Sequence, residues 1–334
     1  MTARPRVGFL GVGWIGRHRM EAMLATGLVE AAAIADPSPE MAAEAARLAP
    51  DAAIVGGLPE LLDLGLDGIV IATPSALHAE QAIACLERGT AVFCQKPLGR
   101  TADEAAAVVA AARSADRLLE VDLSYRFTDG MGRVRELLRS GELGRIYAAD
   151  LVFHNAYGPD KPWFYDRKLA GGGCLMDLGV HLIDLLLWAL DFPEVADVRG
   201  RAFHQGAPLL PGNDQVEDYA VGTLALEDGA TAQLACSWRL HAGREAIISA
   251  TFYGTDGGVS FRNVGGSFYD FAAERFRGTE TELLTDAPEE WGGRAAAQWA
   301  TRLANGDRFC GAAERLVEAA RIIDRLYAAP PLAG

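Results

Sequence analysis

VGFLGVGWIG, residues 7–16, combines a short apolar run with three regularly spaced glycines. The run Val7–Leu10 predicts a buried strand, and a helical pattern follows the glycines. This order of strand, tight turn and helix is typical of a dinucleotide-binding βαβ unit. Gly11 would permit the sharp turn, Gly13 the close approach of a pyrophosphate, and Gly16 the tight packing of helix on strand. The free N–H groups at the helix start would then hold the phosphates.

A second apolar run, Val29–Ala35, ends in Asp36, where such a unit places the carboxylate that binds the adenosine ribose. A glycine-rich turn could precede any packed helix, but the two features together predict a nicotinamide dinucleotide. Asp36 would repel a 2′-phosphate, and the next residue is Pro37 rather than a phosphate-binding arginine. The expected cofactor is therefore NAD, with NADP less favoured.

Length and composition narrow the class of protein. The 334 residues, 50% of them hydrophobic, suffice for a large core divided between two domains. The five cysteines are scattered without C-x-x-C spacing, which supports neither a disulfide framework nor a cysteine zinc site and indicates a cytoplasmic protein. A net charge of -14 without a Lys/Arg cluster disfavours nucleic acid and anionic membranes. The apolar run Leu182–Leu190 is too short to span a bilayer and contains Asp184, so no membrane partner is expected.

Residues 1–123 alternate short apolar runs with alanine-rich helical patterns. This alternation predicts a parallel sheet with helices on both faces, the Rossmann arrangement of a dinucleotide-binding domain. The predicted strands are Val7–Leu10, Val29–Ala35, Ala53–Val55, Gly68–Ala72, Ala91–Cys94 and Leu118–Leu123. Ser38 and Thr101 have the spacing of helix caps.

Residues 124–334 differ in character and predict a substrate-binding and oligomerisation domain. Turn signals between apolar runs indicate hairpins, and hence an open, mostly antiparallel sheet with helices on one face and a second subunit over the other. The fold class is α/β plus α+β. A helix is predicted at Met131–Ser140 and another at Cys310–Ala329, ended by Pro330-Pro331. The predicted strands are Ile146–His154, Val198–His204, Asp218–Leu226, Thr231–Arg239, Ala246–Tyr253, Gly258–Arg262 and Ser267–Phe276.

Polar residues directly after strands are the first candidates for chemistry, because ligands of open parallel sheets bind beyond the carboxyl ends of the strands. Thr73 and Pro74 follow the fourth strand, where the backbone could lie flat against a cofactor ring. A plain helix entry with a structural His78 would look the same. Lys96 follows the fifth strand and could bond a substrate oxygen, or it could be an ordinary surface lysine.

GGGCLMDLGVH, residues 171–181, leads glycines into a helical pattern. Asp177 and His181 are four residues apart and therefore share a helical face. This spacing suits a histidine that exchanges a proton beside an orienting carboxylate. It would also suit two metal ligands, but no credible third ligand accompanies them, so no metal is expected. A helix cap with a buried, hydrogen-bonded histidine is the alternative.

The ordered set of motifs resembles the glucose–fructose oxidoreductase/inositol dehydrogenase/rhizopine catabolism (Gfo/Idh/MocA) family over essentially the whole chain. The resemblance implies that Lys96, Asp177 and His181 are catalytic, with His181 as the proton shuttle. It also implies dimers or tetramers built through the second domain's sheet. Gln95 stands where the family more commonly has Glu, and its amide adds no negative charge beside Lys96.

The expected cofactor-binding residues of the glycine turn and the second strand are Gly11, Gly13, Trp14, Ile15, Gly16 and Asp36. The resemblance implies that Thr73, Pro74, His78 and Gln95 line the nicotinamide side of the cofactor site. The expected substrate-binding residues are Lys96, Arg126, Trp163, Tyr165, Asp177 and His181. Arg126 follows the sixth strand, and the rings of the aromatic loop could stack on a sugar face or serve only as a lid.

The predicted activity is the NAD-dependent interconversion of a secondary alcohol and a ketone or lactone on a sugar, inositol or sugar derivative. Two alternatives stay open. A glycoside-cleaving enzyme would retain its NAD through turnover and release no NADH. A non-enzymatic dinucleotide-binding regulator would need neither the lysine nor the aspartate–histidine pair.

Overall fold

The computed structural model describes residues 3–210 and 212–329, which form two compact units. The first unit contains the residues up to Ser124 together with Gly292–Val317. The second contains Tyr125–Trp291 and the residues from Glu318 onward. The sequence-based division after residue 123 is one residue from the first crossing, but it assigned residues 292–317 to the second domain, whereas they pack with the first unit.

A six-stranded, wholly parallel sheet forms the centre of the first unit, in the order β3-β2-β1-β4-β5-β6. This is the predicted Rossmann sheet, and each strand lies within two residues of its predicted bounds. The strands are β1 Arg6–Leu10, β2 Glu30–Ala35, β3 Ala53–Ile54, β4 Gly68–Ile71, β5 Ala91–Cys94 and β6 Leu119–Val121. The helices are α1 Trp14–Ala25, α2 Pro39–Ala46, α3 Leu58–Leu62, α4 Ser75–Glu87, α5 Ala102–Ala115 and α9 Arg294–Ala304, followed by the 3₁₀ segment Gly311–Val317.

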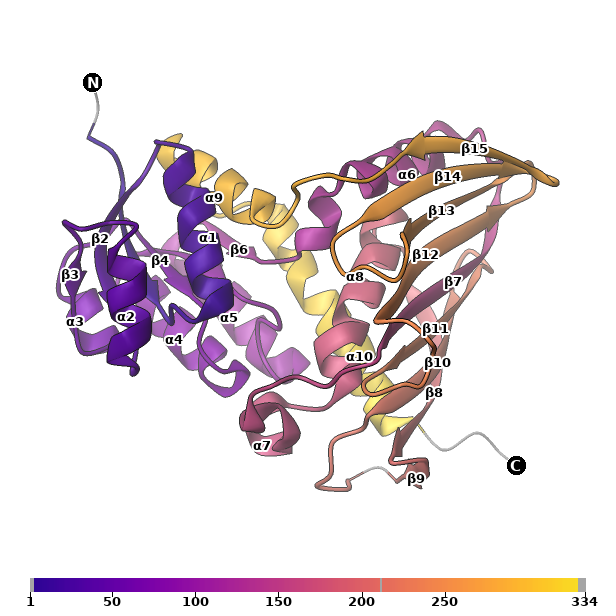
Figure 1. Cartoon of the computed structure of the whole chain (residues 1–334), viewed down its shortest axis with the longest axis horizontal. Coiled ribbons are helices and arrows are strands. Elements are labelled where there is room, and N and C mark those ends of the chain that lie inside the picture. Colours follow the sequence, from indigo (N-terminus) through magenta and orange to yellow (C-terminus); the bar gives the residue numbers. More distant parts are fainter. Residues whose placement is uncertain (1–2, 211, 330–334) are drawn as a thin grey trace. The chain divides into compact units, whose positions relative to one another are not determined.

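Helices cover both faces of this sheet, with α1 and α9 on one side and α4 and α5 on the other (Figure 1). The predicted caps are confirmed, because Ser38 Oγ accepts from the N–H of Met41 and Thr101 Oγ1 from that of Glu104. The sequence pattern had not indicated α9. The fully buried Trp299 of α9 packs directly on Gly68 of β4, so closely that a Cβ on Gly68 would lie 2.6 Å from its ring. This late segment therefore completes the core of the first unit.

A nine-stranded mixed sheet forms the second unit, in the order β15-β14-β13-β12-β7-β11-β10-β8-β9. All pairs are antiparallel except β7 with β11, as the prediction of a mostly antiparallel sheet requires. The strands are β7 Ile146–Asn155, β8 Val195–His204, β9 Ala207–Leu209, β10 Tyr219–Leu226, β11 Thr231–Ser237, β12 Ala246–Gly254, β13 Gly258–Asn263, β14 Phe271–Arg277 and β15 Glu280–Thr285. The edge strands β9 and β15 were not predicted, because one is three residues long and the other is largely exposed.

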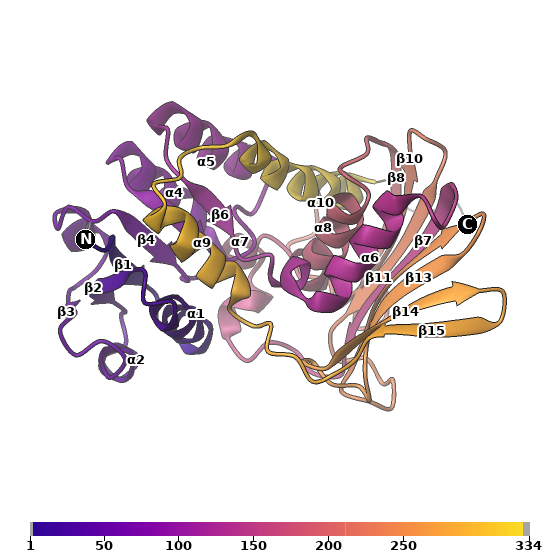
Figure 2. The same cartoon turned by 90° about the horizontal axis from the view of Figure 1, so that it is seen from above.

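Three helices cover one face of this sheet, namely α6 Asp129–Ser140, α8 Val180–Ala189 and α10 Glu318–Ala328 (Figure 2). Short elements connect them: the 3₁₀ segments Ser124–Phe127 and Pro162–Tyr165, α7 Arg167–Ala170 and the π-helical segment Leu175–Gly179. The predicted single helix Cys310–Ala329 was wrong, because a 3₁₀ segment in the first unit precedes α10 in the second. Pro330-Pro331, predicted to end it, lie outside the described residues.

The segment Arg167–Ala189 is long and apolar enough by composition to cross a membrane, with a hydropathy of 1.4. However, 78% of its most apolar stretch is buried inside the structure. Leu186 in α8 is fully buried in the same core as Leu151 and Phe252 of the sheet. Packing in the second core therefore accounts for the apolar character of this segment.

Candidate functional site

The three glycines of the turn after β1 differ in why a side chain is absent: packing excludes one at Gly11 and Gly16, but not at Gly13. Gly11 has φ +81°, and a Cβ on it would lie 2.6 Å from the carbonyl oxygen of Ala72. A Cβ on Gly16 would lie 2.1 Å from the carbonyl oxygen of Gly11, so the fold itself requires both glycines. A Cβ on Gly13 would meet nothing within 4 Å. Gly13 therefore leaves open space at the start of α1, where backbone N–H groups can bind a phosphate.

Helix α1 begins at Trp14, which is 62% exposed, and continues through the half-buried Ile15. Gly13 is the N-cap and has no side chain with which to satisfy the first N–H groups. The two predicted cofactor contacts Trp14 and Ile15 thus occupy the first turn of the helix. Their peptide N–H groups belong to the set that an anion at this helix start would bind.

Asp36 joins the end of β2 to the glycine turn. Its Oδ2 accepts from the N–H of Val12 at 2.7 Å, and its Oδ1 accepts from the N–H of Ser38 at 2.8 Å. Each carboxylate oxygen can accept a second hydrogen bond, so both keep acceptor capacity for a ribose hydroxyl. The structure therefore holds this carboxylate beside the glycine turn.

The turns after β4 and β5 are tied together by a buried histidine. The His78 ring is 1% exposed, with Nδ1 2.7 Å from the carbonyl oxygen of Pro97 and Nε2 2.7 Å from that of Thr73. Burial is the main cause that lowers the pKa of His78. Thr73 Oγ1 in turn donates to Gln81 Oε1 at 2.6 Å. Both ring nitrogens of His78 therefore face backbone carbonyl oxygens of the two turns.

Gln95 belongs to a buried polar network at the end of β5. Its Nε2 donates to Asp122 Oδ2 at 2.5 Å, and Arg19 Nε donates to the same oxygen at 2.5 Å. Ser124 Oγ donates to Asp122 Oδ1 at 2.6 Å. Gln95, Asp122 and Arg19 are 7%, 1% and 6% exposed. The amide at position 95 thus supplies Asp122 with a hydrogen-bond donor that an ionised carboxylate would lack.

The parallel sheet brings the first-unit candidates to one edge. The ladder continues past the strand ends, with Gly11 N donating to Ala35 O at 2.8 Å and Gln95 N to Ile71 O at 2.8 Å. The carboxyl ends of β1, β2, β4 and β5 carry the glycine turn, Asp36, Thr73-Pro74 and Gln95-Lys96. Lys96 is half-buried there. This is the edge where open parallel sheets bind ligands.

Asp177 and His181 lie on a helix that changes type between them. Asp177 is in the π-helical segment and His181 is in the first turn of α8, whereas the sequence pattern indicated a regular helix. Asp177 Oδ2 accepts from Trp238 Nε1 at 3.0 Å. The His181 ring packs edge-on against Tyr125 with centroids 4.9 Å apart. Both side chains are half-buried, and π-helical segments are frequent at functional sites.

The aromatic loop of the second unit lies close to Asp177. Trp163 stacks on Phe164 with ring centroids 3.8 Å apart, and Tyr165 packs against Trp238 at 5.6 Å. Because Trp238 also donates to Asp177, this loop and the carboxylate belong to one continuous cluster. The rings could therefore bind the apolar face of a sugar beside Asp177.

Arg126 is committed to a buried ion pair within the second unit. Its Nε donates to Asp184 Oδ2 at 2.7 Å, and a terminal guanidinium N–H donates to Asp184 Oδ1. The side chains of Arg126 and Asp184 are 17% and 5% exposed, and the guanidinium lies 5.6 Å from the centroid of the Phe192 ring. Burial raises the pKa of Asp184, against the opposing effect of Arg126. Any substrate contact of Arg126 would have to use its remaining N–H donors.

Sequence reasoning missed the partners of these residues. Asp122 directly follows β6, but the predicted strand Leu118–Leu123 extended past it, so the rule that singles out polar residues after strands did not find it. Trp238 directly follows β11 and lies inside the predicted strand Thr231–Arg239. Tyr125 and Asp184 have no local signal, because their relevance depends on contacts made through the fold. Within residues 3–210 and 212–329, no group of three or more His, Cys, Asp or Glu residues could hold a metal ion.

Comparisons with known proteins agree with both units. Residues 5–123 match the oxidoreductase family with an NAD-binding Rossmann fold, and residues 131–260 match the GFO/IDH/MocA C-terminal domain. The putative UDP-kanosamine synthase oxidoreductase subunit of Amycolatopsis mediterranei is 34% identical over 260 residues, which cover 73% of this chain and 71% of the relative. Other relatives bear names such as D-glucoside 3-dehydrogenase and inositol 2-dehydrogenase.

Solved structures share the fold over nearly the whole chain. Levoglucosan dehydrogenase in complex with NADH has a TM-score of 0.84 at 24% identity, covering 99% of this chain and 100% of its own. KijD10, a 3-ketoreductase from Actinomadura kijaniata in complex with NADP, has a TM-score of 0.83 at 22% identity, covering 98% of each chain. At these identities the likeness concerns the fold, and the two neighbours hold different forms of the dinucleotide.

Proposed function

Because this chain belongs to the Gfo/Idh/MocA family of NAD-binding oxidoreductases, we propose that it interconverts a secondary alcohol and a ketone or lactone on a sugar, inositol or related compound. The observation that carries the proposal is the open space at Gly13 beside the fixed carboxylate of Asp36. A turn built only for packing would not need a glycine at a position where a side chain meets no atom. The names of the relatives support a carbohydrate or cyclitol substrate.

The proposed cofactor is NAD. The Asp36 carboxylate is held beside the turn by the N–H groups of Val12 and Ser38, and its negative charge opposes a 2′-phosphate. Pro37 provides no cation there. NADH fluorescence titration should give a dissociation constant at least about tenfold lower than that of NADPH, and Asp36→Ser should narrow the ratio. Equal or tighter binding of NADPH by the wild-type protein would contradict this choice.

The chemistry assigned to the chain's own residues follows the family resemblance. A bound nicotinamide supplies the hydride acceptor or donor. His181 exchanges the hydroxyl proton of the substrate, and Lys96 and Asp177 hold the reacting oxygen. The positively charged ammonium group of Lys96 stabilises the negative charge that the reacting oxygen gains. The aromatic cluster of Trp163 and Tyr165 provides apolar surface for a sugar ring.

The direct test screens the purified protein with NAD against sugars and inositols, following the absorbance of the reduced nicotinamide. Lys96→Ala and His181→Ala should each lower turnover by about a hundredfold or more while leaving NADH affinity nearly unchanged. His241→Ala, at an exposed position, is the control and should keep full activity. Unchanged turnover in both active-site variants would refute these assignments.

The same assay separates the alternatives. A dehydrogenase forms NADH in proportion to product, whereas a glycoside-cleaving enzyme that retains its dinucleotide would cleave substrate with no net NADH. A dinucleotide-binding regulator would bind NADH and convert no member of the panel. We favour the dehydrogenase because Lys96, Asp177 and His181 would serve no purpose in a regulator.

We also propose that two or four copies assemble through the second unit's sheet in the cytoplasm. Helices cover one face, while the other presents the half-buried apolar residues Val152, Val221 and Ile247. A second copy would bury this face, as one-sided antiparallel sheets with apolar outer residues require. Light scattering should give a dimer or tetramer, and Ile247→Lys should reduce it to a smaller species. A monomeric wild-type protein would exclude this assembly.

A further inference from the structure

A single buried glutamate holds the start of the segment that carries Asp177. Glu217 is fully buried and lies two residues before the first residue of β10. Its Oε1 accepts from the N–H groups of Gly173 and Leu175, each at 2.9 Å, and its carbonyl oxygen accepts from the N–H of Cys174 at 2.9 Å. Three consecutive peptide N–H groups therefore donate to one residue.

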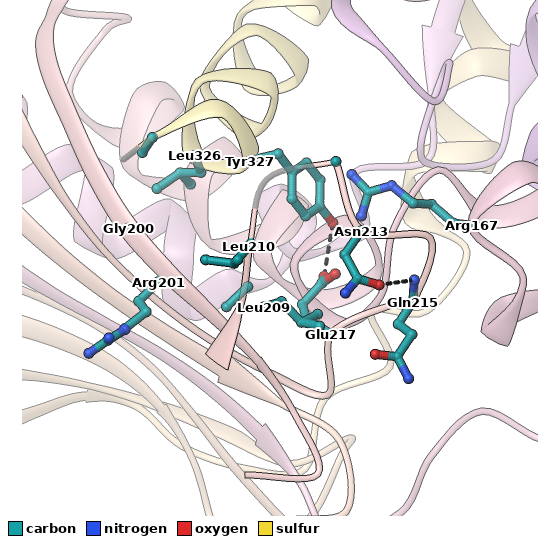
Figure 3. A pocket seen from close by; sticks show the side chains of 13 residues that line it. Arg167, Gly200, Arg201, Leu209, Leu210, Asn213, Gln215, Glu217, Leu326 and Tyr327 are labelled. Atoms are coloured by element: carbon teal, nitrogen blue, oxygen red, sulfur yellow. Dashed lines mark hydrogen bonds between the residues drawn. The ribbon is translucent and has the colours of Figure 1, made fainter. Parts of the chain in front are cut away.

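A tyrosine completes this anchor from α10. Tyr327 donates its hydroxyl to Glu217 Oε1 at 2.8 Å, as Figure 3 shows within a small pocket lined by Arg167 and Arg201. The Arg167 guanidinium lies over the Tyr327 ring, 4.8 Å from its centroid. The carboxylate thus gains its hydrogen bonds from the helix start and from a residue more than a hundred positions later.

The glycines before Asp177 are explained by this anchor. A Cβ on Gly172 would lie 1.9 Å from the Tyr327 hydroxyl oxygen, and a Cβ on Gly173 would lie 1.9 Å from the Glu217 carbonyl oxygen. Any side chain at either position would displace the anchor, so the glycine run serves a close approach within the protein. The sequence pattern alone could not distinguish this purpose from the approach of a ligand.

The anchor leads directly into the candidate catalytic residues. The N–H of Asp177 donates to the Gly173 carbonyl oxygen at 3.0 Å, and His181 follows in the first turn of α8. Cys174, the N-cap of the π-helical segment, makes no side-chain cap of its own. Glu217 therefore acts as a cap supplied from elsewhere in the fold, where a negative group also complements the helix dipole. Its Oε2 is buried without a hydrogen-bond partner, so the anchor depends on Oε1 alone.

We propose that Glu217, supported by Tyr327, is a positioning residue that sets the orientation of Asp177 and His181 for proton exchange. The inference rests on the proposed dehydrogenase function. It assigns no contact with substrate to Glu217 itself. It predicts that a hydrogen-bond acceptor at the Oε1 position matters more than the negative charge of Glu217. The reason is that two peptide N–H groups and the Tyr327 hydroxyl all donate to that oxygen.

The test compares Glu217→Gln, which keeps an acceptor oxygen, with Glu217→Ala, which removes it. Tyr327→Phe is the milder variant should Glu217→Ala fail to fold, since it deletes one donor and keeps the ring. Glu282→Ala, at an exposed position of β15, is the control. Amide hydrogen exchange of residues 173–181 should be at least about tenfold faster in Glu217→Ala, and near wild type in Glu217→Gln and the control.

Kinetics on the sugar that the wild-type protein turns over supply the second readout. Glu217→Ala should lower kcat by about tenfold or more, leave NADH affinity within about twofold, and raise the kinetic isotope effect of the C-deuterated substrate. If the substitution only lowered the fraction of folded protein, the sample would bind fewer equivalents of NADH and its kinetic isotope effect would be unchanged. Glu217→Gln should recover most of kcat, and Tyr327→Phe should fall between the two.

The outcomes separate the two proposals. Unchanged exchange at residues 173–181 in Glu217→Ala overturns the anchor. Faster exchange with unchanged kcat and isotope effect overturns its role in positioning. Faster exchange in a protein whose wild type converts no sugar or inositol leaves the anchor standing, overturns the proposed function and removes the role in catalysis.

Discussion

Replacing Gln95 by Glu would place a second carboxylate in the buried network at the end of β5. The Gln95 amide donates to Asp122 Oδ2 at 2.5 Å, and both side chains are less than one tenth exposed. Two carboxylates at this distance cannot both stay ionised, so the Gln95→Glu variant must take up a proton or break the network. Arg19 is the cation that contacts this site, and it already donates to Asp122.

The size of the effect follows from the cost of protonation. Keeping a glutamic acid neutral at pH 7 costs about 3.7 kcal/mol, because its ordinary pKa is about 4.3 and each pKa unit is worth about 1.36 kcal/mol. Arg19 offsets part of this cost, so we expect Gln95→Glu to lower the free energy of unfolding by about 2–3 kcal/mol. The folded-state pKa of the new carboxyl is raised above its unfolded value. Destabilisation therefore grows as pH rises above about 4.3, and it should shrink to about 1 kcal/mol at pH 5.

Urea unfolding at several pH values, compared with wild type, provides the measurement. Gln298→Glu, exposed on α9 in the same unit, is the control and should cost little at any pH. The double variant Gln95→Glu/Asp122→Asn restores one carboxylate and one amide with their roles exchanged, and should recover more than half of the loss. A Gln95→Glu variant as stable as wild type at neutral pH, or a loss that does not vary with pH, would refute the reasoning.

Three further predictions concern other residues of the two units. Gly13→Ala should leave the unfolding midpoint unchanged but weaken NADH binding by about tenfold, whereas Gly16→Ala should lower the midpoint because its Cβ would meet a backbone oxygen at 2.1 Å. Arg126→Ala should cost about 3–5 kcal/mol in urea unfolding by leaving the Asp184 carboxylate buried without its cation, and a second substitution Asp184→Asn should return part of it. Because burial lowers the pKa of His78, the unfolded chain takes up a proton just below about pH 6.5 that the folded chain does not. The free energy of unfolding should therefore decrease as the pH is lowered through this range, and it should decrease less in His78→Gln. An equal pH dependence in both proteins would contradict this.

Much of the fold could be predicted from the sequence, because its central strands are strongly patterned. The buried run Ala91–Cys94 was predicted with its observed bounds, and the sheet type followed from the alternation of runs and helices. The edge strands and α9 could not be predicted. Glu280–Thr285 is held as a strand by pairing with β14, and the apolar side of α9 has meaning only beside residues such as Gly68.

The candidate site could be predicted as a set of residue types but not as a set of contacts. Glycine spacing and the residues after strands indicated Gly13, Asp36 and Lys96 directly. The partners that orient the site residues come from distant positions, as Trp238 does for Asp177. No period in the sequence distinguishes the π-helical turn from an ordinary one, because a four-residue spacing returns to nearly the same side in both. The roles of Glu217 and Asp122 depend on such long-range pairing.

The return of Gly292–Val317 to the first unit has a consequence for biosynthesis. An amino-terminal domain ordinarily folds while the ribosome is still making the rest of the chain. Here Trp299, which packs beside Gly68 and Phe93, is translated only after residues 125–291 of the second unit. Until then, the first unit exposes the apolar surface that Trp299 later covers. A chimaera that contains only the first 124 residues would leave this surface exposed permanently.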